Sequence, residues 1–395
     1  MNTVLCLASY FKGLQLLTAY RQLGCRIVVI AGMDLRDQPW PEEIVDELHF
    51  IPDVTDVPNL IKGVSYLARE TQFDRVVPLE EYCMAAAASV RAHLGISGIE
   101  ETTARRFRDK YTMRCRARDR GIPVPAFELL LNNQRLAEFA ESVPGPWLIK
   151  PRAEAGAVKI QKVHNAEEMW EVANSLGDDE SNYLIEDFIP GEVCHVDSVI
   201  HQGEPVFALP SRYGKPPFDV WNGGGVFMSS TVPNPDPLRE RLLEQNRQLI
   251  AAMGIEWGVT HAEFIHGENG ELYFLEIAAR VCGANLDRMV WAASGVDLFY
   301  EQARVDLCNF RGERYSLKKP KSRHAGLLEC LTSVKEPQLG LEEMKEVVWQ
   351  LDKDYHAGVV LAASTGKKVK QLLDDLSRKL AEEHLAVLPA ADRPT

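Results

Sequence analysis

Short apolar runs alternate with amphipathic stretches over residues 1–101. The runs stand at 4–8, 27–30, 49–51 and 75–78, and the stretches between them carry apolar residues at the spacing of a helix. Such alternation is typical of parallel strands joined by crossover helices. The pattern therefore predicts an N-terminal α/β domain built on a parallel sheet.

Residues 102–190 follow a different pattern. They open with an arginine-rich helix, whose cations either form a solvated face or include one or two that reach a phosphate. The apolar strand 147–150 ends in Lys150, and a turn of small residues, Glu154 to Ala157, separates it from a second run at 158–163. This order predicts a hairpin able to fold over a ligand.

Longer strands dominate residues 191–316. An alternating strand covers 193–200, and two apolar strands at 259–265 and 272–277 are joined by a short polar turn. A run with four cations then predicts a linker into a C-terminal α/β lobe, residues 317–395. The expected fold class is α/β and α+β, with a parallel-sheet domain followed by further subdomains.

Length, composition and charge narrow the classes of function. The 395 residues suffice for two or three domains, and 46% hydrophobic with 26% charged residues is ordinary globular composition. A formal net charge of −13 disfavours nucleic acids and anionic membranes as partners. No apolar run is long enough to span a bilayer and no signal peptide is evident, so we expect a cytoplasmic protein.

Two common kinds of site find no support in the sequence. The eight cysteines include no C-x-x-C pair, which favours reduced structural thiols over a zinc site or a disulfide framework. The loop after the first strand, Ser9 to Gly13, is not G-x-G-x-x-G, so a dinucleotide-binding dehydrogenase is disfavoured.

The clearest candidate for chemistry is a pair of carboxylates on the hairpin 259–277. Period-two alternation puts Glu263 on the same face as His261, and antiparallel pairing brings Glu276 of the next strand beside it. Adjacent carboxylates repel unless a cation lies between them, and Mg²⁺ with nucleotide phosphates is the natural occupant. The alternative is two exposed glutamates on an ordinary hairpin.

Five motifs in a fixed order resemble the ATP-grasp superfamily. They are Lys110 after Asp109, Lys150 before the small-residue turn, the run Glu186 to Glu192, Glu263, and Glu276-x-x-x-Arg280. The resemblance covers residues 1–310 and is nearest to ligases that act on amino acids and small carboxylic acids, with a C-terminal lobe similar to that of biotin carboxylase. It implies a lid subdomain at 102–190 and a catalytic subdomain at 191–316.

The resemblance also implies roles for individual residues. Lys110 and Lys150 would hold ATP phosphates, the run that begins at Glu186 would meet adenine, and Glu192 would meet the ribose hydroxyls. Arg280 would stabilise charge on the transferred phosphoryl group, beside Mg²⁺ held by Glu263 and Glu276. The complete nucleotide-binding set is Lys110, Lys150, Glu154, Gly156, Glu186, Asp187, Phe188, Ile189 and Glu192.

The chain departs from the family pattern in two places. Ala278 stands where the family usually has an asparagine metal ligand, which puts a second metal position in doubt. Gly156 is the only glycine in the turn 154–159, where several are usual, and Lys159 either contacts a phosphate or points to solvent.

Candidate substrate contacts are His195, Asp197, Arg212 and His261. His195 and Asp197 share one face of their strand and either border an acceptor pocket or form a buried polar pair satisfied by neighbours. Arg212 precedes a loop rich in glycine and aromatic residues, 213–225, whose cations could pair with a carboxylate.

The function expected from these residues and the resemblance is ATP-dependent ligation of a carboxylate to an amine through an acyl phosphate. The ligands would be ATP, Mg²⁺ and two small molecules, with no nucleic acid or membrane partner and a homodimer left open. One alternative is phosphorylation of bicarbonate, as in biotin carboxylase or carbamoyl-phosphate synthesis. The other is a nucleotide-binding module with weakened catalysis, for which Ala278 is the best argument.

Overall fold

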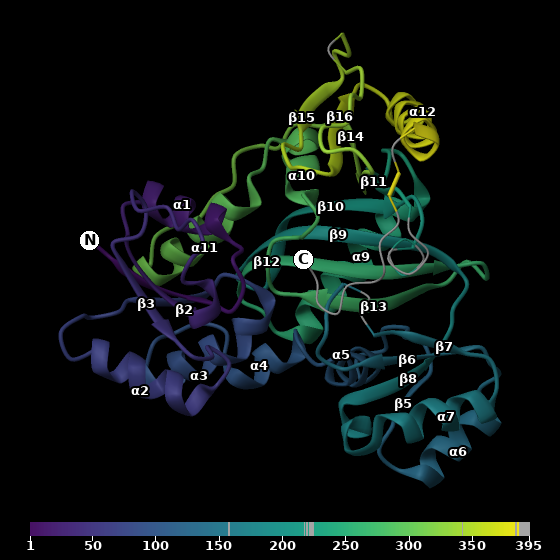
Figure 1. Cartoon of the computed structure of the whole chain (residues 1–395), viewed down its shortest axis with the longest axis horizontal. Coiled ribbons are helices and arrows are strands. Elements are labelled where there is room, and N and C mark those ends of the chain that lie inside the picture. The colour runs from purple at the N-terminus through teal and green to yellow at the C-terminus, as the bar shows by residue number, and fades with distance from the viewer. Residues whose placement is uncertain are drawn as a thin grey trace.

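A computed structural model describes residues 1–156, 159–216, 218, 220, 225–341, 343–383, 385 and 386. Its strands form three sheets. In Figure 1 the N-terminal sheet lies on the left, the largest sheet runs from the centre to the top, and the smallest lies below it on the right.

The N-terminal sheet consists of four parallel strands, in the order β3 (Glu47–Ile51), β2 (Arg26–Gly32), β1 (Thr3–Ala8) and β4 (Arg75–Pro78). On β1, Val4 and Cys6 pack toward α1 (Leu14–Gln22), whereas Leu5 and Leu7 pack toward α2 (Val57–Leu67) and α3 (Met84–Leu94). The predicted parallel sheet with crossover helices is therefore confirmed.

The smallest sheet is antiparallel, in the order β5 (Phe127–Leu129), β8 (Tyr183–Asp187), β6 (Trp147–Pro151) and β7 (Gln161–Val163). Helices α6 (Asn133–Ser142) and α7 (Ala166–Leu176) pack against it (Figure 1). The strands β6 and β7 form the hairpin expected from the sequence. Residues 157 and 158, in its connection, lie outside the described part of the chain.

The largest sheet has eight antiparallel strands. Their order is β13 (Leu272–Ala278), β12 (Trp257–Gly267), β9 (Gly191–His201), β10 (Glu204–Tyr213), β11 (Phe227–Thr231), β14 (His324–Leu331), β16 (His356–Ala363) and β15 (Val347–Gln350). The helix α9 (Pro237–Met253) packs on one face, and α10 (Leu286–Ser294) packs on the other.

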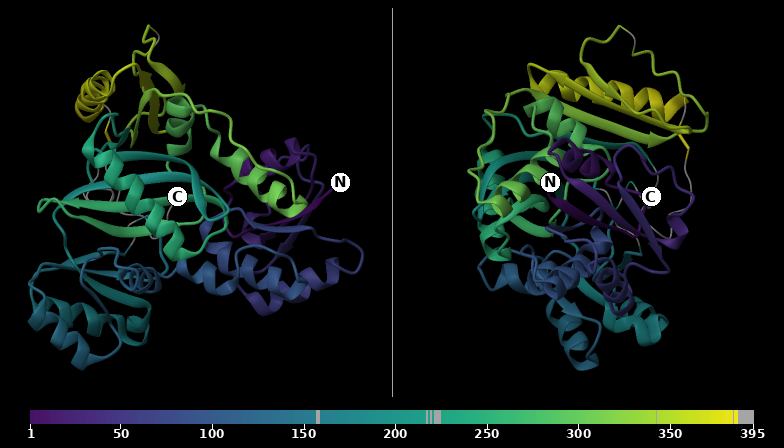
Figure 2. Two further views of the ribbon diagram at one scale, coloured as in Figure 1. Left: turned by 180° about the vertical axis from the view of Figure 1, so that it is seen from behind. Right: turned by 90° about the vertical axis from the view of Figure 1, so that its left-hand side faces the viewer.

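Two segments pack against parts of the fold that lie far from them in the sequence. Strand β11 pairs with β14, with Ser230 opposite Gly326, so the C-terminal strands continue the sheet that carries β9 and β12. The helix α12 (Gly366–Glu383) covers β14 and β16, as Figure 2 shows from two further sides. The helix α11 (Leu298–Arg311) instead packs against α1 of the N-terminal domain.

Two further predictions can be compared with the fold. Among the described residues, no helix combines the length and the hydrophobicity needed to cross a membrane. All eight cysteines are free thiols, as their spacing predicts.

Candidate active site

Three buried charges join the smallest sheet to the largest. Lys150 on β6 forms an ion pair with one oxygen of Glu186 on β8, and Arg114 Nη2 donates to the other oxygen at 2.8 Å. Lys150, the most accessible of the three, is only 3% exposed. Burial disfavours the ammonium and lowers the pKa of Lys150 to about 8, although the charge of Glu186 opposes this.

This cluster of Lys150, Glu186 and Arg114 contains two cations and one carboxylate. Although burial opposes ionisation of Glu186, the charges of Arg114 and Lys150 lower the pKa of its carboxyl group. The cluster therefore carries one positive charge that no member compensates. Because an uncompensated buried charge is costly, an anionic ligand beside Lys150 would stabilise the arrangement.

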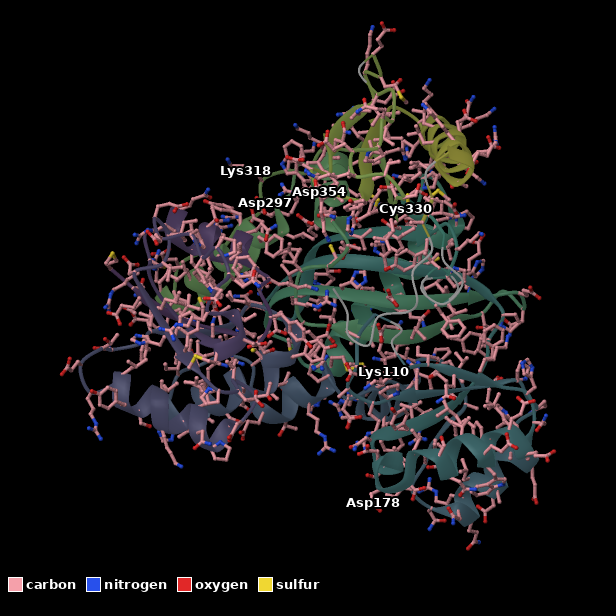
Figure 3. The ribbon with its side chains drawn as sticks, in the orientation of Figure 1. Lys110, Asp178, Asp297, Lys318, Cys330 and Asp354 are labelled. Carbon is pink, nitrogen blue, oxygen red and sulfur yellow. The ribbon has the colours of Figure 1, made fainter. Side chains whose placement is uncertain are left out.

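The helix α5 (Lys110–Arg118) carries a second lysine to the same region. Asp109 caps this helix by accepting hydrogen bonds from two of its first backbone N–H groups. Lys110 Nζ lies 2.9 Å from an oxygen of Glu276 and donates to the carbonyl of Glu154. Figure 3 shows Lys110 at the junction between the largest and smallest sheets.

Arg114 lies one turn after Lys110 and holds α5 on the edge of the largest sheet. Its Nη1 donates to the carbonyl of Phe274 at 2.8 Å and to that of Leu275, both on the edge strand β13. Since β13 also carries Glu276, this contact fixes α5, and with it Lys110, relative to the carboxylate of Glu276. The arginine-rich stretch seen in the sequence therefore includes a fully buried cation.

The two candidate metal ligands meet across the hairpin, as the alternation of their strands predicts. Glu263 of β12 stands directly opposite Glu276 of β13. Glu263 accepts a hydrogen bond from the hydroxyl of Tyr213 at 2.7 Å, and His261 Nε2 lies 3.4 Å away. Ala278 is the register partner of His261 and ends the strand, so Arg280 lies beyond β13.

A buried polar network adjoins Glu263. The Asp197 carboxylate is hydrogen-bonded to Nδ1 of His195 and Nδ1 of His261, both at 2.8 Å, and His195 Nε2 lies 2.8 Å from Ser229 Oγ. Burial disfavours the charged imidazole, but the charge of Asp197 outweighs it and raises the pKa of His261 to about 10. His195 and Asp197 are fully buried and satisfied by neighbours, so their contact with a substrate stays a prediction.

Sequence reasoning missed an acidic residue of the N-terminal domain. Glu81, three residues beyond β4, accepts from Arg280 Nε at 2.9 Å and forms an ion pair with Arg108. Burial opposes its ionisation, but the charges of Arg280 and Arg108 lower the pKa of Glu81 to about 2. The available signal was its place just past the carboxyl end of a parallel strand, where such folds bind ligands.

The turn that follows β6, residues 152–156, contacts the N-terminal domain and is called the covering turn below. The carboxylate of Glu154 accepts a hydrogen bond from the hydroxyl of Tyr82 at 2.9 Å, and Gly156 has a left-handed φ of 72°.

The run expected to meet adenine, Glu186 to Ile189, already uses two of its backbone N–H groups within the protein. The N–H of Asp187 donates to the carbonyl of Ala126 at 2.8 Å, and that of Phe188 donates to the carbonyl of Pro146 at 3.1 Å. Contacts of this run with adenine therefore stay a prediction, and they would have to use its other backbone groups, such as those of Ile189.

The expected ribose contact, Glu192, lies on β9, and the expected substrate contact Arg212 lies on the neighbouring strand β10. Glu192 is exposed, with its carboxylate 3.8 Å from Arg212 Nη1, and Arg212 Nη2 donates to Asp236 at 3.1 Å. The charge of Arg212 is thus shared between two carboxylates. The glycine-rich residues 221–224 of the following loop lie outside the described part of the chain.

The comparison with known families places this arrangement in a class. Residues 107–284 match the family model described as ATP-grasp domain. This range contains both lysines, both metal-ligand candidates and Arg280. The protein therefore carries an ATP-grasp domain, and the resemblance inferred from its motifs is confirmed.

The chain is also similar to individual enzymes and solved structures. The chain is 24% identical over 269 residues to an L-arginine-specific L-amino acid ligase of Bacillus subtilis, a match that covers 66% of this chain and 64% of the relative. The L-amino acid ligase of Bacillus licheniformis has the same fold over 98% of both chains, with a TM-score of 0.75 and 19% identity. Carboxyaminoimidazole ribonucleotide synthase of Aspergillus clavatus, solved with ATP, gives a TM-score of 0.72 at 16% identity and covers 96% of this chain and 98% of its own.

Proposed function

We propose that this protein is an ATP-dependent ligase that joins a carboxylate to an amine through an acyl phosphate, releasing ADP and phosphate. The observation that carries the proposal is the contact of Lys110 with Glu276, which stands opposite Glu263 in the hairpin. A lysine able to bind phosphate therefore lies beside two carboxylates able to bind a metal ion. The similarity to L-amino acid ligases supports an amino acid as one of the substrates.

The nucleotide would lie between the smallest and largest sheets. Lys110 and Lys150 would bind its phosphates, and the positive charge in excess around Lys150 supports that role. The run from Glu186 to Ile189 would meet adenine. Glu192, whose carboxylate is exposed, would accept hydrogen bonds from the ribose.

The residues present fit magnesium. Glu263 and Glu276 offer hard oxygen ligands. Lys110 balances the charge of Glu276 in this structure, and a divalent cation bound beside Glu276 would balance the same charge. When bound with ATP, Mg²⁺ would neutralise phosphate charge during phosphoryl transfer. Lys110 and Lys150 would orient the phosphates toward the substrate carboxylate.

The remaining chemistry requires no covalent nucleophile from the protein. Arg280 would stabilise negative charge on the phosphoryl group in transfer and on the tetrahedral intermediate formed by the amine. The turn 152–156 would exclude water, because a solvated acyl phosphate would be hydrolysed. We also propose small molecules as the partners and, from the eight free thiols, a cytoplasmic location.

The test is release of phosphate from Mg·ATP in the presence of pooled amino acids, with mass spectrometry of the products. The proposal expects a condensed product of an acid and an amine for each phosphate released. Phosphate release that requires only bicarbonate would instead support the carboxylase-like alternative. ATP binding without release in any pool would support a non-catalytic module.

The affinity for ATP is expected to fall as the pH rises above 8. Lys150 must be protonated to bind phosphate, and its pKa of about 8 in the free protein would rise on binding. The association constant should therefore drop by up to about tenfold per pH unit above 8 until the pKa of the complex is reached. Calorimetry between pH 7 and 10 would measure this, with Lys150→Arg as the control because its guanidinium stays charged. Parallel pH profiles for the two proteins would contradict the assignment.

Mg·ATP is expected to slow hydrogen exchange in the β6–β7 hairpin. Closure of the turn over the phosphates would protect backbone amides in peptides that span residues 150–163. Peptides from α12, which packs on β14 and β16 at the other end of the largest sheet, provide the control. Identical exchange in residues 150–163 with and without saturating Mg·ATP would show that the hairpin is not the phosphate lid.

A further inference from the structure

Arg280 owes its orientation to another domain. It follows the end of β13, where strand pairing no longer fixes the direction of a side chain. Its Nη1 donates to the neighbouring carbonyl of Val281 at 2.9 Å, its Nε donates to Glu81 Oε2 at 2.9 Å, and its Nη2 lies 2.7 Å from the same oxygen. Glu81 is therefore the distant group that holds the guanidinium plane.

The same carboxylate organises a second arginine. Arg108, which forms an ion pair with the other oxygen of Glu81, also donates to the carbonyl of Ala153 in the covering turn. Its guanidinium lies 4.8 Å from the ring centroid of Tyr82, whose hydroxyl binds Glu154. Glu81 thus lies where the N-terminal domain, the covering turn and Arg280 converge.

A contribution to folding stability is not a sufficient explanation for the buried carboxylate of Glu81. Buried ion pairs often contribute little net stability, because desolvation offsets the attraction between the charges. One carboxylate between two arginines also leaves a net positive charge, which favours binding of an anion. A guanidinium fixed before that anion arrives would need no reorganisation during the reaction, which is the condition for effective electrostatic stabilisation.

We propose that Glu81 is a positioning residue for phosphoryl transfer, which acts by holding Arg280 in the orientation that the transferred group requires. This inference rests on the proposed function, because it assigns Arg280 its role there. It makes the N-terminal domain part of the catalytic apparatus. Glu81 does not touch the reacting atoms and acts through Arg280.

A double-mutant cycle tests the coupling. Glu81→Gln should lower kcat about 30- to 100-fold, the scale expected when a group is misplaced by about 1 Å, with the KM for ATP within about threefold of wild type. Because Glu81 acts through Arg280, the double variant Glu81→Gln/Arg280→Gln should be no slower than Arg280→Gln alone. Losses that multiply, or a Glu81→Gln protein with wild-type kcat, would overturn the proposal.

The matched control is Asp306→Asn. Asp306 on α11 is also a largely buried acid that joins the N-terminal domain to the rest of the chain, through Arg75, but it lies outside the site. This variant should lower the melting temperature without a selective loss of kcat. If Glu81→Gln does not fold, Glu81→Asp keeps the charge, withdraws it by one methylene and should still lower kcat at least about tenfold.

A spectroscopic measurement separates this inference from the proposed function. The Nε–H resonance of Arg280, assigned by its loss in Arg280→Lys, should exchange slowly with water in the wild-type protein and rapidly in Glu81→Gln. This result needs no substrate, so it decides the positioning claim even if no ligation is found. Equal exchange rates in the two proteins would overturn the inference, whereas absent phosphate release in the wild type would overturn the proposed function.

Discussion

Replacement of Glu276 by glutamine is expected to lower the rate of ligation by at least about 10³-fold while the fold stays intact. The amide oxygen carries no formal charge and therefore binds Mg²⁺ more weakly than the carboxylate does, and stabilisation of phosphoryl charge by a metal is worth several kcal/mol. The change also removes the carboxylate that lies 2.9 Å from Lys110. Phosphate release with the active substrate pool, together with circular dichroism, measures the two parts of this expectation.

The matched control for Glu276→Gln is Glu271→Gln. Glu271 lies on the same hairpin, in the exposed turn just before β13. Its replacement should leave the rate within about twofold of wild type, as is usual for a surface change. A Glu276→Gln protein that retains activity within a few-fold of wild type would exclude Glu276 as a metal ligand.

Replacement of Glu186 by glutamine is expected to lower the free energy of unfolding by about 3–5 kcal/mol, because it leaves two buried cations without their shared counterion. Lys150 and Arg114 both depend on this carboxylate. Urea-induced unfolding followed by circular dichroism would measure the loss. Excess phosphate or ATP should recover part of it if either anion binds beside Lys150.

Glu128→Gln provides the comparison for Glu186→Gln. Glu128 lies on β5, beside β8, and forms an ion pair at 2.7 Å with Arg135, whose side chain is 60% exposed. Because the arginine of this pair stays mostly in solvent, loss of the pair should cost at most about 1 kcal/mol. Equal destabilisation by the two substitutions would contradict the account of the buried cluster.

Local periodicity predicted the parts of the site that lie on neighbouring strands. The alternation along β12 and β13 was sufficient to place Glu263 opposite Glu276, because antiparallel pairing links register to sequence spacing. Likewise, the apolar strand that ends in Lys150 and the small-residue turn after it indicated the hairpin of β6 and β7.

The contacts that span long stretches of sequence were not predictable in the same way. Glu81 meets Arg280 across 199 residues, and no local pattern encodes that approach. Arg114 was one of several arginines in a basic helix, and only tertiary packing distinguishes a buried cation from a solvated one. The sequence also assigned Lys150 and Glu186 separate roles with phosphate and adenine, whereas their side chains form one ion pair.

The continuity of the largest sheet limits how the protein can be divided. Truncation after Tyr315 would remove β14 and leave the backbone of β11 unpaired along one edge. An exposed edge of this kind is a template for strand pairing between molecules, so such a fragment should aggregate. Chimeras that exchange C-terminal segments between related ligases should therefore place their junctions where they preserve the β11–β14 pairing.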